Sequence, residues 1–127
     1  MSVTHLDHFN LRVPLAELEP LCRFYEQALA LTVGERPPFR SKGFWLYAEG
    51  QPLLHITGFE GEPVKPADTG WFSHIALKCR DFETARARLD ASGVAYEVEE
   101  VPQLRQRQIF FTDPVGVGVE LNFDSDG

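Results

Sequence analysis

The stretch Leu-Asp-His-Phe-Asn-Leu-Arg-Val at residues 6–13 returns in altered form as Phe-Ser-His-Ile-Ala-Leu-Lys-Cys at residues 72–79, 66 positions further along the chain. In both stretches the third residue is His, the fourth and sixth are apolar, and the seventh is basic. Apolar and other residues alternate, which is typical of a strand with one face on a core. Such a repeat indicates two copies of one supersecondary unit.

The segments that follow the two stretches also correspond. A helix is predicted at 18–31, and a second one between Asp81 at the N-cap and Gly93 at the C′ position. Further strands are predicted at 44–48, 52–57, 94–98, 108–112 and 117–123, with a turn at 113–116. We therefore predict an α+β fold in which residues 1–127 form one domain. It consists of two βαβββ modules, 1–58 and 71–127, joined by a linker rich in Gly and Pro at 59–70.

The composition excludes several classes of function. With 12 Lys and Arg against 19 Asp and Glu, the net charge of −7 argues against a partner made of nucleic acid or anionic lipid. No apolar run approaches the roughly 20 residues that span a bilayer, and the N-terminus does not resemble a signal peptide. Cys22 and Cys79 are too few for a disulfide framework, so we expect a reduced, cytoplasmic protein.

Four residues able to bind a metal occupy equivalent positions in the two halves. His8 corresponds to His74, and His55 corresponds to Glu120. Each is expected in mid-strand, opposite apolar residues, so that all four line a concave sheet surface. A carboxylate there needs a cation or a donor, and three imidazoles with one carboxylate suit a divalent metal. The alternative for each histidine is a half-buried, hydrogen-bonded residue, and His5, which has no counterpart, is expected at the surface.

Strand alternation places further residues on the same faces as the four candidate ligands. Arg12 is suited to bind an anionic substrate group through its planar guanidinium. The aromatic members of this set have a simpler alternative as core residues. The predicted substrate-binding residues are Asn10, Arg12, Trp45, Tyr47, Gln108, Phe110 and Asn122.

With Phe24-Tyr25, Asp113-Pro114-x-Gly116 and Val119-Glu120-Leu121, the repeated stretches resemble the vicinal oxygen chelate superfamily. This superfamily includes glyoxalase I, bleomycin and fosfomycin resistance proteins, methylmalonyl-CoA epimerase and extradiol dioxygenases. The resemblance covers nearly the whole chain. It implies paired βαβββ modules that form a cup-shaped mixed sheet with the helices on its outer face. It also implies a homodimer, in which modules are sometimes exchanged between chains.

The resemblance further implies one divalent metal ion per site, with Zn, Ni, Co, Mn and Fe as candidates. Its ligands map onto His8, His55, His74 and Glu120. The implied activity is a glyoxalase-like lyase or isomerase reaction on a small oxygen-chelating substrate, with Glu120 or His55 as the base. Glyoxalase I usually has a carboxylate or an amide where this chain has His55. Two alternatives are an Fe(II) extradiol-type dioxygenase and a drug-binding protein without catalysis.

Overall fold

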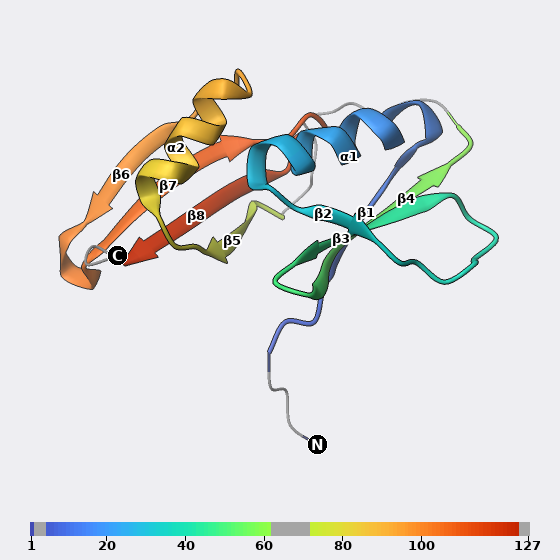
Figure 1. The fold of residues 1–127 in the computed structure, drawn as a ribbon, viewed down its shortest axis with the longest axis horizontal. Coiled ribbons are helices and arrows are strands. Elements are labelled where there is room, and N and C mark those ends of the chain that lie inside the picture. The colour runs from blue at the N-terminus through green and yellow to red at the C-terminus, as the bar shows by residue number, and fades with distance from the viewer. Residues whose placement is uncertain (2–4, 62–71, 125–127) are drawn as a thin grey trace. The chain divides into compact units, whose positions relative to one another are not determined.

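The computed structural model describes residue 1, residues 5–61 and residues 72–124. Strands and α-helices follow one another in the same order in the two halves of the chain, with one strand, one helix and then further strands (Figure 1). The elements are β1 (Phe9–Pro14), α1 (Leu15–Leu29), β2 (Thr32–Gly34), β3 (Gly43–Ala48), β4 (Gln51–Phe59), β5 (His74–Lys78), α2 (Phe82–Ala91), β6 (Glu97–Val101), the 3₁₀ turn η1 (Pro102–Leu104), β7 (Gln106–Thr112) and β8 (Gly118–Asp124).

The strands form two four-stranded mixed sheets with the same topology. Their strand orders are β1-β4-β3-β2 and β5-β8-β7-β6. In each sheet the first and last strands of the half pair in parallel, and the other neighbours are antiparallel. The predicted α+β fold of two βαβββ modules is therefore confirmed.

The chain divides into two compact units between β4 and β5, and Gln27–Leu29 at the end of α1 belongs to the second unit. Phe59, predicted as the first linker residue, is instead the last residue of β4. Most of the predicted linker, residues 62–70, lies outside the described residues.

In the first unit, α1 packs on one face of the sheet, where it lies close to β4 at Gly58. A methyl group on Gly58 would lie 2.7 Å from Leu15 Cδ2 and 3.2 Å from Leu18 Cδ2, so a larger residue here would require these leucine side chains to shift. Ile56, two residues before Gly58, points to the same side and is fully buried. His55 and Thr57 therefore lie on the face away from α1.

In the second unit, α2 packs on the corresponding face of its sheet. The ring of Phe82 meets that of Phe123 edge-on, with centroids 5.3 Å apart, and the Arg107 guanidinium lies 3.9 Å from the Phe82 centroid. Because side chains alternate along a strand, Glu120 and Gln108 point away from α2. The helix thus covers one face and leaves the other for polar groups.

The structure corrects the predicted boundaries near both repeated histidines. β1 begins at Phe9, so His8 precedes the strand, and His74 is the first residue of β5 rather than a mid-strand residue. β2 was not predicted, because three exposed residues are too short to show alternation. α1 begins at Leu15, three residues before the predicted start.

The ends of α2 agree with the prediction in position but not in every contact. Gly93 has φ +71° and its N–H donates to the Asp90 carbonyl at 3.1 Å, as expected of a C′ glycine. Asp81 occupies the N-cap, yet its side chain makes no capping hydrogen bond. Its φ of +66° differs from the extended conformation in which a side chain reaches back to the first turn.

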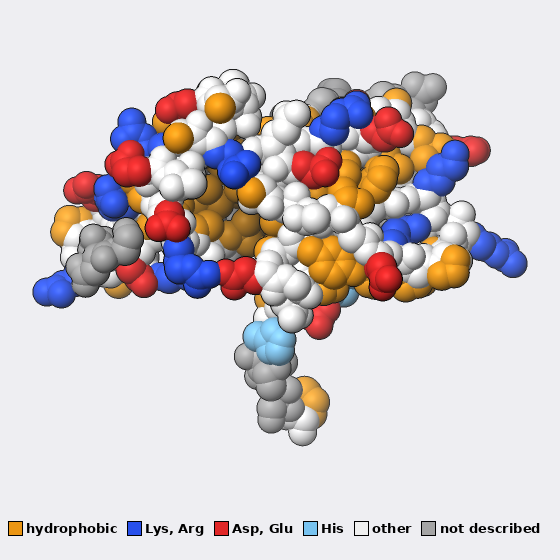
Figure 2. All heavy atoms as spheres, viewed as in Figure 1, with side chains coloured by type: hydrophobic (Ala, Val, Ile, Leu, Met, Phe, Trp, Pro, Cys, Tyr) orange, Lys and Arg blue, Asp and Glu red, His pale blue; other side chains and the backbone are white. Residues whose placement is uncertain are grey.

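The surface carries mixed charge. On the described residues of the face in Figure 2, Lys and Arg side chains are interspersed with Asp and Glu side chains. The net charge of −7 is therefore not gathered into one area of that face. Neither described helix has the length and apolar composition that a membrane span requires.

Candidate functional site

Three aromatic rings form a stack on the face of the first sheet that points away from α1. The His8 and His55 rings lie 3.9 Å apart with an interplanar angle of 14°, and the Trp45 and His55 rings lie 4.0 Å apart at 9°. β4 lies between β1 and β3, and Trp45 pairs with His55 in the sheet register. His55 is therefore the middle ring, and it is only 8% exposed.

Hydrogen bonds orient both imidazoles of the stack. Asp7 Oδ1 lies 2.7 Å from His8 Nδ1, and the Pro52 carbonyl oxygen lies 3.1 Å from His55 Nε2. Because an ionised carboxylate and a carbonyl only accept, the protons belong on His8 Nδ1 and His55 Nε2. In the neutral rings, His8 Nε2 and His55 Nδ1 then carry the free lone pairs.

The charge states of these groups follow from their surroundings. Burial lowers the pKa of His55, and the neighbouring His8 imidazole lowers this pKa further. The hydrogen bond to His8 lowers the pKa of Asp7. At neutral pH, a neutral His55 and an ionised Asp7 are therefore the expected states.

The stack is incompatible with the predicted four-residue ligand set as the rings are arranged. A metal ion lies near the plane of each ligating imidazole, about 2 Å from its nitrogen. Two nearly parallel rings 3.9 Å apart have no such common point, so His8 and His55 cannot both bind one ion in this arrangement. Within residues 5–61 and 72–124, no group of three or more His, Cys, Asp or Glu side chains is gathered as a metal site.

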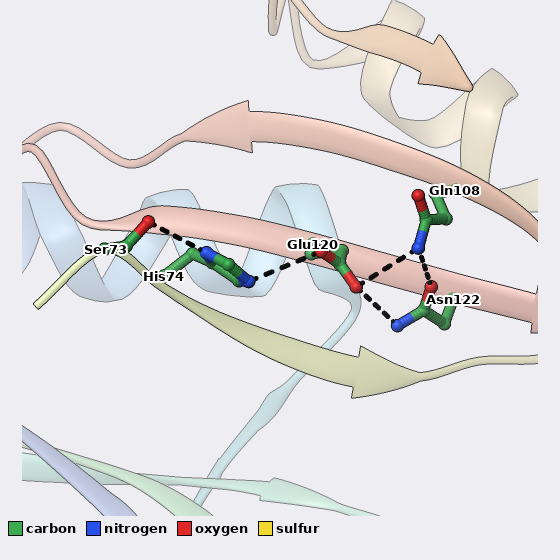
Figure 3. Close-up of polar contacts among 5 residues, drawn as sticks. All are labelled: Ser73, His74, Gln108, Glu120 and Asn122. Carbon is green, nitrogen blue, oxygen red and sulfur yellow. Dashed lines mark hydrogen bonds and ion pairs between the residues drawn. The ribbon is translucent and has the colours of Figure 1, made fainter. Parts of the chain in front are cut away.

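A polar network occupies the corresponding face of the second sheet (Figure 3). Ser73 Oγ lies 2.9 Å from His74 Nδ1, and His74 Nε2 lies 3.4 Å from Glu120 Oε1. The other carboxylate oxygen of Glu120 accepts from Asn122 Nδ2 at 2.7 Å and from Gln108 Nε2 at 3.5 Å. The Glu120 side chain is 13% exposed, so these donors replace most of its hydration.

The predicted substrate-binding residues of β1 lie on the same face as His55. Asn10 pairs with His55 in the register, and its amide donates to Thr57 Oγ1 at 3.1 Å. The Arg12 guanidinium stacks over the Phe59 ring, 4.4 Å from its centroid. This cation–π contact fixes the position of the Arg12 guanidinium over the ring.

Tyr47 and Phe110 differ in what they offer to a ligand. The Tyr47 hydroxyl donates to the Glu35 carbonyl at 2.7 Å, so its proton is already used in a hydrogen bond within the first unit. Phe110 is the register partner of Glu120 on β7 and points to the same face as that carboxylate.

Two contact residues were missed by the sequence reasoning, namely Asp7 and Ser73. Each immediately precedes one of the repeated histidines and contacts its Nδ1. The signal was present, because the 66-residue offset that aligns the histidines also aligns these two polar residues.

A family model matches residues 5–121, and its description is the Glyoxalase/Bleomycin resistance protein/Dioxygenase superfamily. The chain belongs to this superfamily. No curated protein sequence matches the chain.

Solved structures show the same fold. A glyoxylase/bleomycin resistance protein/dioxygenase domain from Frankia sp. EAN1pec superposes with a TM-score of 0.76 at 18% identity, covering 97% of this chain and 99% of that one. A variant of the fosfomycin resistance protein FosX from Listeria monocytogenes, complexed with Mn(II) and 1S,2S-dihydroxypropylphosphonic acid, gives 0.70 at 21%, covering 96% and 93%. TnmS3, an antibiotic binding protein from Streptomyces sp. CB03234, gives 0.67 at 21%, covering 98% of each chain.

The second-unit pair of this superfamily member fits a divalent ion. Two donors that each lie about 2.1 Å from a tetrahedral ion are about 3.4 Å apart, which is the separation of His74 Nε2 and Glu120 Oε1. Ser73 contacts the other nitrogen of His74, and Asn122 contacts the other oxygen of Glu120. Such outer partners commonly orient metal ligands. In the first unit, His8 has the same pattern, with Asp7 on Nδ1 and Nε2 available.

Proposed function

We propose that the chain is a divalent-metal-dependent enzyme with glyoxalase-like lyase or isomerase activity on a small substrate that carries two neighbouring oxygen atoms. The His74–Glu120 pair supports this proposal, because its 3.4 Å donor separation and its outer hydrogen bonds suit a metal site. His8 is proposed as the third ligand.

Three protein ligands leave coordination positions open for substrate oxygens. A bound divalent ion would stabilise the negative charge that develops on these oxygens. Asn122 and Gln108 donate to one oxygen of Glu120, and the other oxygen would serve as the metal ligand.

His55 is the better candidate for the base that moves a proton between adjacent carbons. Burial lowers the pKa of His55, so the ring is neutral at pH 7 and able to accept a proton. Its Nε2 donates to the Pro52 carbonyl, which leaves Nδ1 as the accepting atom. Glu120 is less suited, because both of its oxygens already contact other side chains.

The stacked position of His55 also favours a second candidate function. Without His55, the proposed ligands are two histidines and one carboxylate, the set that non-haem Fe(II) oxygenases use. An extradiol-type dioxygenase is therefore the alternative reaction.

Metal content and two assays distinguish the candidates. We expect protein purified without chelator to contain Ni, Zn, Co or Mn and to isomerise the thiol adduct of a 2-oxoaldehyde. Iron with oxygen uptake on catechols would instead establish the dioxygenase. Failure to bind any of these ions after loading would overturn both reactions and leave a ligand-binding protein.

Single-residue variants assign the roles. We expect Glu120→Ala to lose metal and activity, and His55→Ala to keep metal while losing activity. His5→Ala serves as the matched control, because His5 has no counterpart in the repeat, and it should keep both. An active His55→Ala protein would show that another group is the base.

A further inference from the structure

Each of the two repeated histidines contacts a polar side chain that is not part of the proposed ligand set. In each half, the residue directly before the histidine contacts its Nδ1, with distances of 2.7 Å from Asp7 Oδ1 and 2.9 Å from Ser73 Oγ. Adjacent side chains of a regular strand point to opposite faces. The contacts are possible because His8 precedes β1 and His74 is the first residue of β5.

The two partners differ in what they can accept and donate. An ionised carboxylate only accepts, so Asp7 requires the proton of His8 on Nδ1 and leaves the lone pair on Nε2. A hydroxyl either donates or accepts, so Ser73 is compatible with both tautomers of His74.

The other nitrogen of His74 decides its tautomer before an ion binds. His74 Nε2 lies 3.4 Å from the Glu120 carboxylate, which favours a proton on Nε2. The Ser73 hydroxyl then donates to Nδ1. When Nε2 becomes a metal ligand, it must give up that proton, and Nδ1 must carry one instead.

We propose that Asp7 and Ser73 are positioning residues for the two histidine ligands, with different tasks. Asp7 holds His8 in the ligand tautomer both without and with the metal. Ser73 serves a tautomer switch of His74, in which solvent takes the proton from Nε2 and supplies one to Nδ1 while the hydroxyl turns from donor to acceptor. The proton count of the ring is unchanged. The roles rest on the proposed function, in which His8 and His74 bind the metal.

Nitrogen-15 NMR of the imidazoles tests the proposal directly. At pH 8, where free imidazole is neutral, we expect metal-free protein to show His8 protonated on Nδ1 and His74 protonated on Nε2. Saturation with Zn(II) should move the His74 proton to Nδ1 and leave the His8 proton in place. His8 protonated on Nε2, or His74 already protonated on Nδ1 without metal, would overturn the proposal.

Variants separate the two tasks. Asp7→Ala should give His8 a substantial Nε2-protonated population in the metal-free spectrum, whereas Ser73→Ala should leave that spectrum unchanged. Each should weaken Zn(II) binding about 10-fold, the common effect of losing an outer partner. Asp7→Asn, whose amide oxygen still accepts, should restore the His8 tautomer. Glu83→Ala, which removes an exposed carboxylate from α2, should change neither measurement.

The two readouts also separate this inference from the proposed function. If Zn(II) does not bind at all, the proposed function fails, while the metal-free spectra of the native and Asp7→Ala proteins still decide the role of Asp7. If Zn(II) binds but the His8 tautomer is the same with and without Asp7, the positioning role is wrong and the ligand set stands.

Discussion

Glu120 shows how a carboxylate is kept within an apolar strand. Its sequence neighbours Val119 and Leu121 are buried against the helix side, while its own side chain is 13% exposed on the other face. A carboxylate in this setting needs donors, and the amides of Asn122 and Gln108 supply them. Glu120 is thus held in one orientation by the strands themselves, which is what a preorganised ligand requires.

Removing the closer donor tests this preorganisation. Asn122 Nδ2 lies 2.7 Å from Glu120 Oε2, so Asn122→Ala should weaken Zn(II) binding about 10-fold. It should lower the free energy of unfolding by only about 1 kcal/mol. Isothermal titration and urea unfolding measure the two effects. Gln106→Ala, which removes an amide at the start of β7, is the control, and equal affinity of both variants would contradict the role of Asn122.

Cys22 of α1 provides a pH-dependent test of how well the core of the first unit is buried. Burial raises the pKa of this thiol from 9.0 to about 11. The unfolded chain therefore ionises first as pH rises, so the stability that the neutral thiol contributes is complete below pH 9 and is lost toward pH 11. The loss is on the order of 2 kcal/mol.

The expected consequence concerns the difference between the native protein and Cys22→Ala. At pH 8 the variant should be less stable by about 1 kcal/mol, and this deficit should shrink or reverse by pH 11. Urea unfolding at both pH values measures it, and other titrating groups cancel in the difference. The same difference in unfolding free energy at pH 8 and pH 11 would show that the Cys22 thiol is not buried away from water.

Among the connections between elements, the turn from β7 to β8 places Glu120. Asp113 Oδ1 accepts the backbone N–H groups of Val115 and Val117, both at 2.9 Å, and the Gly116 N–H donates to the Asp113 carbonyl at 3.1 Å. Asp113 is buried. The predicted turn at 113–116 is confirmed, and its first residue closes the hairpin through its side chain.

Loss of this side chain should destabilise the second unit. Asp113→Ala leaves two backbone donors without their acceptor, so we expect the free energy of unfolding to fall by about 2–3 kcal/mol. Asp113→Asn, which keeps an acceptor, should lose less. Asp124→Ala, which removes an exposed pair with Lys78, should cost less than about 1 kcal/mol. Urea unfolding in which Asp113→Ala matches Asp124→Ala would contradict this account.

The sequence predicted the elements whose pattern is local. Alternation and the 66-residue offset identified both modules and aligned His8 with His74, because strand faces follow residue parity. It could not predict the stack of His55 between His8 and Trp45, since ring orientation depends on side chains of two strands and of the segment before β1. Nor could parity predict the contact of Asp7 with His8, which requires His8 to precede β1.

Across the whole molecule, the two units share a topology but differ in chemistry. The first carries a stack of aromatic rings, with a buried imidazole whose lowered pKa suits a base. The second carries a hydrogen-bonded histidine and carboxylate that suit a metal. In the proposed enzyme, Glu120 is a metal ligand and His55 is the base. The two residues therefore correspond by position in the repeat but not by role.

Zn(II) titration of metal-free protein, followed by calorimetry, tests this division of roles. We expect the native protein and His55→Ala to bind one ion per chain with closely similar affinity. His74→Ala and Glu120→Ala, which lose a ligand, should bind at least about 100-fold more weakly. If His55→Ala loses binding to the same extent as His74→Ala, His55 is a ligand and the three-residue site is wrong.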